Sequence, residues 1–246
     1  MLHLYEIHFP RRVPPTFDRP EFGHTSYERA LSSLDHEVGK ILERIDLEQT
    51  VVVLHGDHGE RFERSIVEWT IRGLKWHLWG WPAGRGWYKL DHGYHVYDLL
   101  VRVPLVFIGQ GIFQPGGEIG AQVRQIDIMP TILEALGVRV DPEMNIHGRS
   151  LLPLIKGEQI EELPALVEAC GSAIPDRRNW LRGVRLPPWK YVFAPHNPRI
   201  RPELYHLGED PWESMNLIDQ YPGVVASLRR IITGISSLDE AQRSCQ

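Results

Sequence analysis

The sequence has few cysteines, no long hydrophobic run and no excess of positive charge. Its 246 residues contain two cysteines, Cys170 and Cys245, which are too few for a disulfide scaffold. No apolar run approaches the roughly 20 residues that a transmembrane helix needs. The 27 Lys and Arg residues are scattered and outnumbered by 32 acids, which argues against nucleic-acid binding. No basic segment followed by an apolar one marks a signal peptide, so a cytoplasmic location is expected if Met1 is the authentic start.

The composition is that of an ordinary globular protein, with 42% apolar and 24% charged residues. A strand is expected at residues 2–7. Thr25–Glu28 then has the pattern of a capping box, and apolar residues at helical spacing predict an amphipathic helix over residues 26–46. A strand at residues 50–54 follows, and strand, helix and strand in this order favour a parallel sheet.

The pattern of predicted strands and helices changes in the second half of the chain. A strand at residues 105–108 and a helix over residues 128–136, with Asp127 at its N-cap, come first. From about Ala165, short apolar runs separated by turn signals predict an antiparallel sheet, and a terminal helix is expected over residues 224–235. The predicted strands of this sheet span residues 165–168, 181–185, 190–194 and 204–206.

The segment Val51-Val-Val-Leu-His-Gly-Asp-His-Gly-Glu60 carries the clearest functional signal. A run of β-branched residues ends in Asp57 and His58, which are bracketed by glycines. This is the pattern of a buried parallel strand that delivers two side chains at its carboxyl end, where open α/β sheets bind ligands. A carboxylate beside an imidazole can ligate one metal ion, so Asp57 and His58 are candidate metal ligands.

Several further segments follow this strand in a fixed order, and together they resemble the sulfatase branch of the alkaline phosphatase superfamily. They are Tyr97-Asp-Leu-Leu-Val-Arg-Val-Pro-Leu105, Ile126-Asp-Ile-Met-Pro-Thr131 and Glu203-Leu-Tyr-His-Leu-Gly-Glu-Asp-Pro-Trp-Glu-Ser-Met-Asn-Leu217. The resemblance covers roughly residues 1–235 and implies an α/β fold: part of an alkaline-phosphatase-like sandwich whose mostly parallel sheet is flanked by helices. Residues 1–160 would belong to the catalytic domain, and residues 161–246 would form a small antiparallel subdomain with a terminal helix.

The resemblance also implies that half of the active site is missing from the sequence. Family members are commonly about twice as long, and their first half carries two metal-binding aspartates and a Cys/Ser-x-Pro-x-Arg segment. The Cys or Ser of that segment becomes the formylglycine nucleophile. Neither Cys170 nor Cys245 has this context, so the chain is expected to be the C-terminal half of a sulfatase-like protein.

The resemblance assigns further roles by position. Asp57 and His58 would complete a divalent metal site, for which calcium is the usual family metal and manganese or zinc would also suit an imidazole ligand. His8, followed by Phe9-Pro10, would contact the sulfate or protonate the leaving alkoxide. His92, with Lys89 as the competing assignment, would contact the sulfate. His95 is expected to support the site or to lie at the surface. We expect the ligands and the other site residues to face one cleft.

Three functions remain open on the sequence. The first is hydrolysis of a sulfate ester, which could be a small molecule or a glycan. Five tryptophans lie between Gly59 and His92, and they either stack on sugar or aryl rings of the substrate or pack an insertion against the domain. The second is the chemistry of phosphodiesterases, phosphonate hydrolases or phosphoethanolamine transferases of the same superfamily. The third is a non-catalytic binding protein. A complementing N-terminal half or a homo-oligomer is the expected protein partner, because strands that are apolar on both faces need cover.

Overall fold

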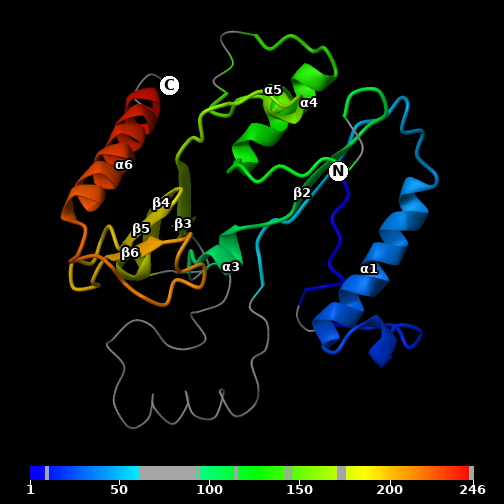
Figure 1. Ribbon diagram of the computed structural model, residues 1–246, viewed down its shortest axis with the longest axis horizontal. Helices are drawn as coiled ribbons and strands as arrows, with labels where there is room; N and C mark the ends of the chain where they lie inside the picture. The colour runs from blue at the N-terminus through cyan, green and yellow to red at the C-terminus, as the bar shows by residue number, and fades with distance from the viewer. Residues whose placement is uncertain are drawn as a thin grey trace. The chain divides into compact units, whose positions relative to one another are not determined.

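The computed structural model describes residues 1–8, 11–60, 93, 95–113, 116–141, 144, 146–170 and 176–243, with side chains described as far as residue 235. The chain divides into two compact units (Figure 1). The first comprises Met1–Val52 and Phe107–Phe113, and the second comprises Val53–Val106 and Gln114–Gln246. The predicted division near residue 160 stays a prediction.

The first unit is dominated by helix α1 (Ser26–Leu42), which follows the short 3-10 helix η1 (Pro20–Phe22). The predicted capping box is confirmed: the Glu28 N–H donates to Thr25 Oγ1, and the Thr25 N–H donates to the Glu28 carboxylate. These reciprocal bonds satisfy N–H groups that have no partner within the first turn of a helix. The helix ends four residues earlier than predicted, at Leu42.

The strand predicted at residues 2–7 is wrong. Residues 1–5 have no regular structure, and the chain then turns so that the His8 N–H donates to Tyr5 O at 3.0 Å. A strand is stable only beside a partner strand that satisfies its N–H and C=O groups, and a local alternation of apolar and polar residues does not supply one.

Strands β1 (Val52–His55) and β2 (Leu105–Ile108) form a two-stranded sheet. Their positions confirm the strands expected there, although β1 is shifted by one to two residues. Beyond β1 the pairing continues, because the Gly56 N–H donates to Pro104 O at 3.2 Å. The described residues do not show the mostly parallel sheet that the sequence predicts, and it stays a prediction.

Helix α4 (Ile128–Ala135) in the second unit is preceded by η3 (Gln125–Asp127) and followed, after a loop, by α5 (Leu152–Ile155). Asp127 is the N-cap residue of α4, as predicted, but its side chain makes no capping hydrogen bond to this helix. Its buried carboxylate instead accepts from Arg124 and from the Arg149 N–H, at 2.7 Å and 3.0 Å. Thr131, fully buried, donates to Asp127 O and accepts from the Leu151 N–H. The helix and the loop of residues 147–151 are therefore joined through buried polar contacts, which are costly to break.

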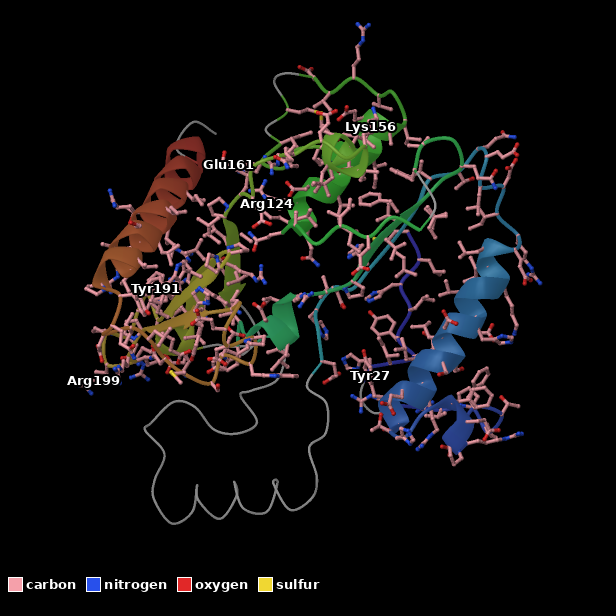
Figure 2. All side chains as sticks on the ribbon, viewed as in Figure 1. Tyr27, Arg124, Lys156, Glu161, Tyr191 and Arg199 are labelled. Carbon is pink, nitrogen blue, oxygen red and sulfur yellow. The ribbon has the colours of Figure 1, made fainter. Side chains whose placement is uncertain are left out.

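The antiparallel sheet predicted near the C-terminus is confirmed. Its strands are β3 (Ala165–Ala169), β4 (Leu181–Leu186), β5 (Trp189–Phe193) and β6 (Glu203–His206), paired in that order, with η4 (Arg177–Asn179) before β4. Helix α6 (Pro222–Arg243) packs on this sheet through Leu228 and Ile232, which contact Tyr191 and its neighbours. Figure 2 shows Tyr191 among these strands. Residues 165–243 are called the C-terminal subdomain below.

The short helix α3 (Asp98–Val101) and the residues before it are built into the C-terminal subdomain. Val96 is fully buried in a cluster with residues of β3, β4 and β5. His95, expected to support the site or to lie at the surface, is buried and stacks on Tyr97 with ring centroids 3.9 Å apart. The segment from His95 to α3, which follows the predicted sulfate-binding residues in the sequence, is thus held in place by packing.

Large apolar side chains remain exposed on the sheet and helices of the second unit. Val106 of β2 is 45% exposed, Met129 of α4 is 49% exposed and Leu136, just after α4, is 55% exposed. Exposed apolar surface of this kind is typical of an interaction site or an association hazard. No helix among the described residues is long and apolar enough to cross a membrane.

We expect the purified chain to self-associate, because these apolar side chains are exposed and no other strand of the described residues pairs with the edges of the β1–β2 sheet. Sedimentation velocity over a range of concentrations should show species larger than a monomer. Replacing Met129 and Leu136 by glutamate should shift the distribution towards monomer. The same change at Trp212, which is 76% exposed in the C-terminal subdomain, should have a smaller effect. A monodisperse wild-type monomer at all concentrations would contradict this expectation.

Candidate functional site

Asp57 and His58 lie in a tight turn directly after β1. The His58 N–H donates to Asp57 Oδ1 at 2.9 Å, and His58 Nε2 lies 3.8 Å from Asp57 Oδ2. The Asp57 side chain is 65% exposed and that of His58 is 31% exposed. Two donor atoms at this separation can reach the same cation, because metal–ligand distances in proteins are about 2.0–2.6 Å.

The contact made by Nδ1 of His58 determines whether its Nε2 can bind a metal ion. Its Nδ1 lies 2.8 Å from Gly59 O, and a carbonyl oxygen only accepts, so Nδ1 carries the proton. Neutral His58 therefore presents a lone pair on Nε2, the nitrogen on the Asp57 side. Metal-binding histidines commonly donate their other N–H to a carbonyl in this way, which fixes the tautomer and the ring orientation.

Both glycines of the turn lie close to neighbouring residues, and Gly59 is the more tightly packed of the two. A Cβ at Gly56 would lie 3.2 Å from the Cβ of Val103, and a Cβ at Gly59 would lie 2.0 Å from the backbone oxygen of Leu99. The Gly59 N–H also donates to Leu100 O at 2.7 Å. The turn is thus packed against the chain around α3, which only a residue without a side chain permits.

Gln125, at the start of η3, contacts the same turn from the other side. Its Nε2 donates to Gly56 O at 2.9 Å and to Asp57 O at 3.4 Å. Asp57 and Gln125 both line an open pocket of about 470 Å³. The other lining residues come from β1 and α4: His55, Ile128, Met129, Ile132 and Leu133. Gln125 could not be identified from the sequence, because a contact to backbone atoms 69 residues away leaves no local pattern.

The remaining predicted site residues cannot be placed beside Asp57. His8 belongs to the first unit, where its ring lies 6.4 Å from that of Tyr5. His92 and Lys89 lie outside the described residues, as do the five tryptophans that precede His92. The convergence of these side chains on one cleft stays a prediction.

The donor set at Asp57 and His58 fits part of a divalent cation site. A carboxylate oxygen and an imidazole nitrogen are ordinary ligands for such an ion. Among the described residues, no group of three or more His, Cys, Asp or Glu side chains could hold a metal ion. Two ligands bind a hard cation weakly, because such ions prefer six or more oxygen ligands.

Comparison with protein families supports the resemblance noted in the sequence. The model of the family described as Sulfatase matches residues 1–138, which is more than half of the chain. The chain belongs to the sulfatase family. A second family model, described as the C-terminal region of N-sulphoglucosamine sulphohydrolase, matches residues 85–237, which include most of the C-terminal subdomain.

Individual sulfatase relatives are distant and considerably longer. Human arylsulfatase K is 26% identical over 229 residues, which is 89% of this chain and 38% of the relative. The choline-sulfatase of Rhizobium meliloti is 27% identical over 205 residues, or 81% of this chain and 34% of that protein. The chain therefore spans between a third and two fifths of the length of these relatives.

Solved structures share the fold. BT1596, a 2-O GAG sulfatase, superposes with a TM-score of 0.63 at 23% identity, covering 87% of this chain and 42% of the other. The phosphonate monoester hydrolase of Agrobacterium radiobacter gives a TM-score of 0.60 at 23% identity, covering 87% of this chain and 41% of the other. The α/β fold of the sulfatases is therefore shown, and at these identities the likeness extends to the fold alone.

Proposed function

We propose that this chain forms the C-terminal half of a metal-dependent sulfatase that hydrolyses a sulfate ester. The observation that carries the proposal is the turn after β1, in which an oxygen of the Asp57 carboxylate and Nε2 of His58 lie 3.8 Å apart in a member of the sulfatase family. Sulfatases generally use a divalent metal, and we propose calcium here, with manganese or zinc as alternatives. In the complete domain the sheet would be mostly parallel, as the sequence predicts.

A divalent ion bound by Asp57 and His58 would supply Lewis-acid stabilisation of negative charge on sulfate oxygens. The residues of this chain would position that ion: the Gly59 carbonyl holds the His58 ring, and the His58 N–H holds the Asp57 carboxylate. We assign to His8 a contact with the sulfate or proton transfer to the leaving oxygen, and to His92 or Lys89 a contact with the sulfate. Formylglycine is not formed in this sequence, so the nucleophile would come from a complementing N-terminal half.

The substrate class is proposed as a sulfated small molecule or glycan. BT4656, whose structure contains its substrate D-glucosamine-2-N,6-O-disulfate, has the same fold with a TM-score of 0.62. The phosphonate monoester hydrolase also shares the fold, so hydrolysis of a phosphonate or phosphate ester is the second candidate. The match of residues 85–237 to a sulphohydrolase C-terminal region favours the sulfate ester.

We expect the purified chain to show no measurable turnover of nitrocatechol sulfate with calcium or manganese present. Covalent catalysis needs a nucleophile, and partial charge stabilisation alone gives a far smaller acceleration. Activity of this chain alone that is lost in Asp57→Ala would show that it contains an unrecognised nucleophile.

Co-expression with a polypeptide that carries the Cys/Ser-x-Pro-x-Arg segment tests the proposal directly. We expect turnover of nitrocatechol sulfate to appear, and Asp57→Ala or His58→Ala in this chain to reduce it at least a hundredfold. Faster turnover of bis-nitrophenyl phosphate would favour the second candidate. Turnover that is unchanged by Asp57→Ala would remove these residues from the site, and a complex without turnover on either substrate would favour a binding protein.

A further inference from the structure

Gln125 lies beside the proposed cation site without supplying a charged ligand. Its side-chain amide donates to two successive carbonyl oxygens, those of Gly56 and Asp57, at 2.9 Å and 3.4 Å. These two carbonyls belong to the peptide planes on either side of the Asp57 Cα. Restraining both planes restrains the two backbone dihedrals of Asp57, which set the direction of its Cβ and hence of its carboxylate.

Gln125 can act in this way because its own backbone is firmly held. It begins η3, which ends at the buried Asp127, and the carboxylate of Asp127 accepts from the Arg124 N–H on one side and from the Arg149 N–H on the other. The loop of residues 147–151 packs so closely that a Cβ at Gly148 would lie 1.9 Å from Ile126 O. The amide of Gln125 therefore extends from a rigid base to an exposed turn.

We propose that Gln125 is a positioning residue for Asp57: it fixes the turn after β1 so that the Asp57 carboxylate is preorganised for a divalent cation. This rests on the proposed function, in which Asp57 is a metal ligand. Residues that orient a ligand commonly affect metal affinity by tenfold or more although they never touch the metal. Gln125 acts on the backbone, whereas the Gly59 carbonyl acts on the His58 ring, so the two ligands are oriented by different groups.

Hydrogen–deuterium exchange of the full chain tests the contact without any metal. Amides of Gly56, His58 and Gly59 each donate a hydrogen bond, so exchange in the peptide that covers them reports on the turn. We expect Gln125→Leu to accelerate this exchange about five- to tenfold, the effect of one lost hydrogen bond, with exchange in β4 and β5 unchanged. The matched control is Gln49→Leu, since Gln49 is an exposed glutamine whose amide donates to Asp46 in the first unit.

The dissociation constant for Mn²⁺, measured by electron paramagnetic resonance on the same proteins, tests the consequence. Binding by the wild type is expected to be weak and to be lost in Asp57→Asn, and Gln125→Leu should weaken it about tenfold while Gln49→Leu leaves it unchanged. A melting temperature unchanged in Gln125→Leu would separate positioning from general destabilisation.

The outcomes distinguish this inference from the proposed function. Exchange in the turn that is the same in Gln125→Leu as in wild type would overturn the inference even if Asp57→Asn abolishes Mn²⁺ binding. Faster exchange with unaltered, Asp57-dependent Mn²⁺ affinity would also overturn it, because the turn would then be held without effect on the ligand. Faster exchange in a chain without Asp57-dependent Mn²⁺ binding would uphold the contact and overturn the proposed cation site.

Discussion

Replacing Lys190 by methionine should destabilise the C-terminal subdomain by about 3–5 kcal/mol, the cost of leaving buried carboxylates without their cation. Lys190 is fully buried on β5. Its Nζ lies 2.9 Å from Asp98 Oδ1 and 2.8 Å from Glu213 Oε1. Methionine fills a similar volume, so the loss would be of charge and hydrogen bonds. Urea denaturation followed by tryptophan fluorescence measures it.

The network around Lys190 joins two segments that carry the family resemblance. Asp98 belongs to the Tyr-Asp-x-x-x-Arg-Val-Pro segment, and its N–H donates to Glu213 Oε2 at 2.5 Å. Glu213 belongs to the Asp-Pro-Trp-Glu segment and has a positive φ of 52°, which an L-residue seldom adopts. Arg185 adds a guanidinium whose Nε and Nη2 donate to the Asp98 carboxylate. The buried ion pairs therefore hold Asp98 and Glu213, and with them the two segments, against the C-terminal sheet.

Two variants serve as controls for Lys190→Met. Arg182→Met on β4 breaks an ion pair with Glu168 in which both side chains are more than a third exposed, and it should cost less than about 1 kcal/mol. Asp98 still pairs with Arg185 in Lys190→Met, whereas Glu213 loses its cation. The double variant with Lys190→Met and Glu213→Gln removes the charge of Glu213 while keeping an acceptor for the Asp98 N–H. It should recover part of the lost stability. A Lys190→Met protein as stable as wild type would show that the buried ions contribute nothing net.

The pH dependence of this effect has a defined sign. Burial would raise the pKa of Asp98, but the hydrogen bonds from Arg185 and the charge of Lys190 hold it below the usual value. A lowered folded-state pKa gives stability that is present above the unfolded pKa of about 4 and is lost as the pH falls through the folded pKa. Burial raises the pKa of Glu213, so this carboxyl becomes protonated at a higher pH than Asp98. The difference between wild type and Lys190→Met should therefore begin to shrink as the pH falls through the raised pKa of Glu213, and should shrink further as it falls through the lowered pKa of Asp98.

Local sequence patterns predicted local structure well. The capping box at Thr25 and the strand at Leu105–Ile108 depend on residues a few positions apart, and both are confirmed. The four strands of the C-terminal sheet were also predicted, because turn residues and apolar runs alternate there. The strand prediction failed at residues 2–7 because a strand forms only beside a partner strand, and the local residues do not show whether one is present.

Long-range polar contacts could not be predicted in the same way. Asp98 and Lys190 are 92 positions apart in the sequence, and Lys190 has the pattern of an ordinary strand residue. Gln125 immediately precedes a recognised segment, but no pattern shows that its amide contacts Gly56. The Asp57-His58 pair was identifiable because the strand and both glycines are contiguous with it. The chemistry of a site can thus be inferred from adjacent residues, whereas the groups that orient it become visible only in the fold.

Replacing Gly59 by alanine should disrupt the turn that carries Asp57 and His58. The added Cβ would lie 2.0 Å from Leu99 O and 2.9 Å from Leu99 C, and both are backbone atoms that cannot rotate away. The backbone of the turn or of α3 must then move, which also strains the hydrogen bond from the Gly59 N–H to Leu100 O. We expect a loss of about 3 kcal/mol or more, at the upper end for overpacking, because no side-chain change relieves the contact.

The matched control for Gly59→Ala is Gly39→Ala. Gly39 lies within α1, and a Cβ there meets no atom within 4 Å. Alanine should stabilise that helix by up to about 1 kcal/mol, because it has the higher helix propensity. Thermal unfolding measures both variants, and hydrogen exchange of the turn should accelerate in Gly59→Ala alone. If Gly59→Ala unfolds at the wild-type temperature with wild-type exchange in the turn, the backbone of α3 is not packed against Gly59. The rigid attachment inferred for Asp57 and His58 would then rest on Gln125 and Pro104 alone.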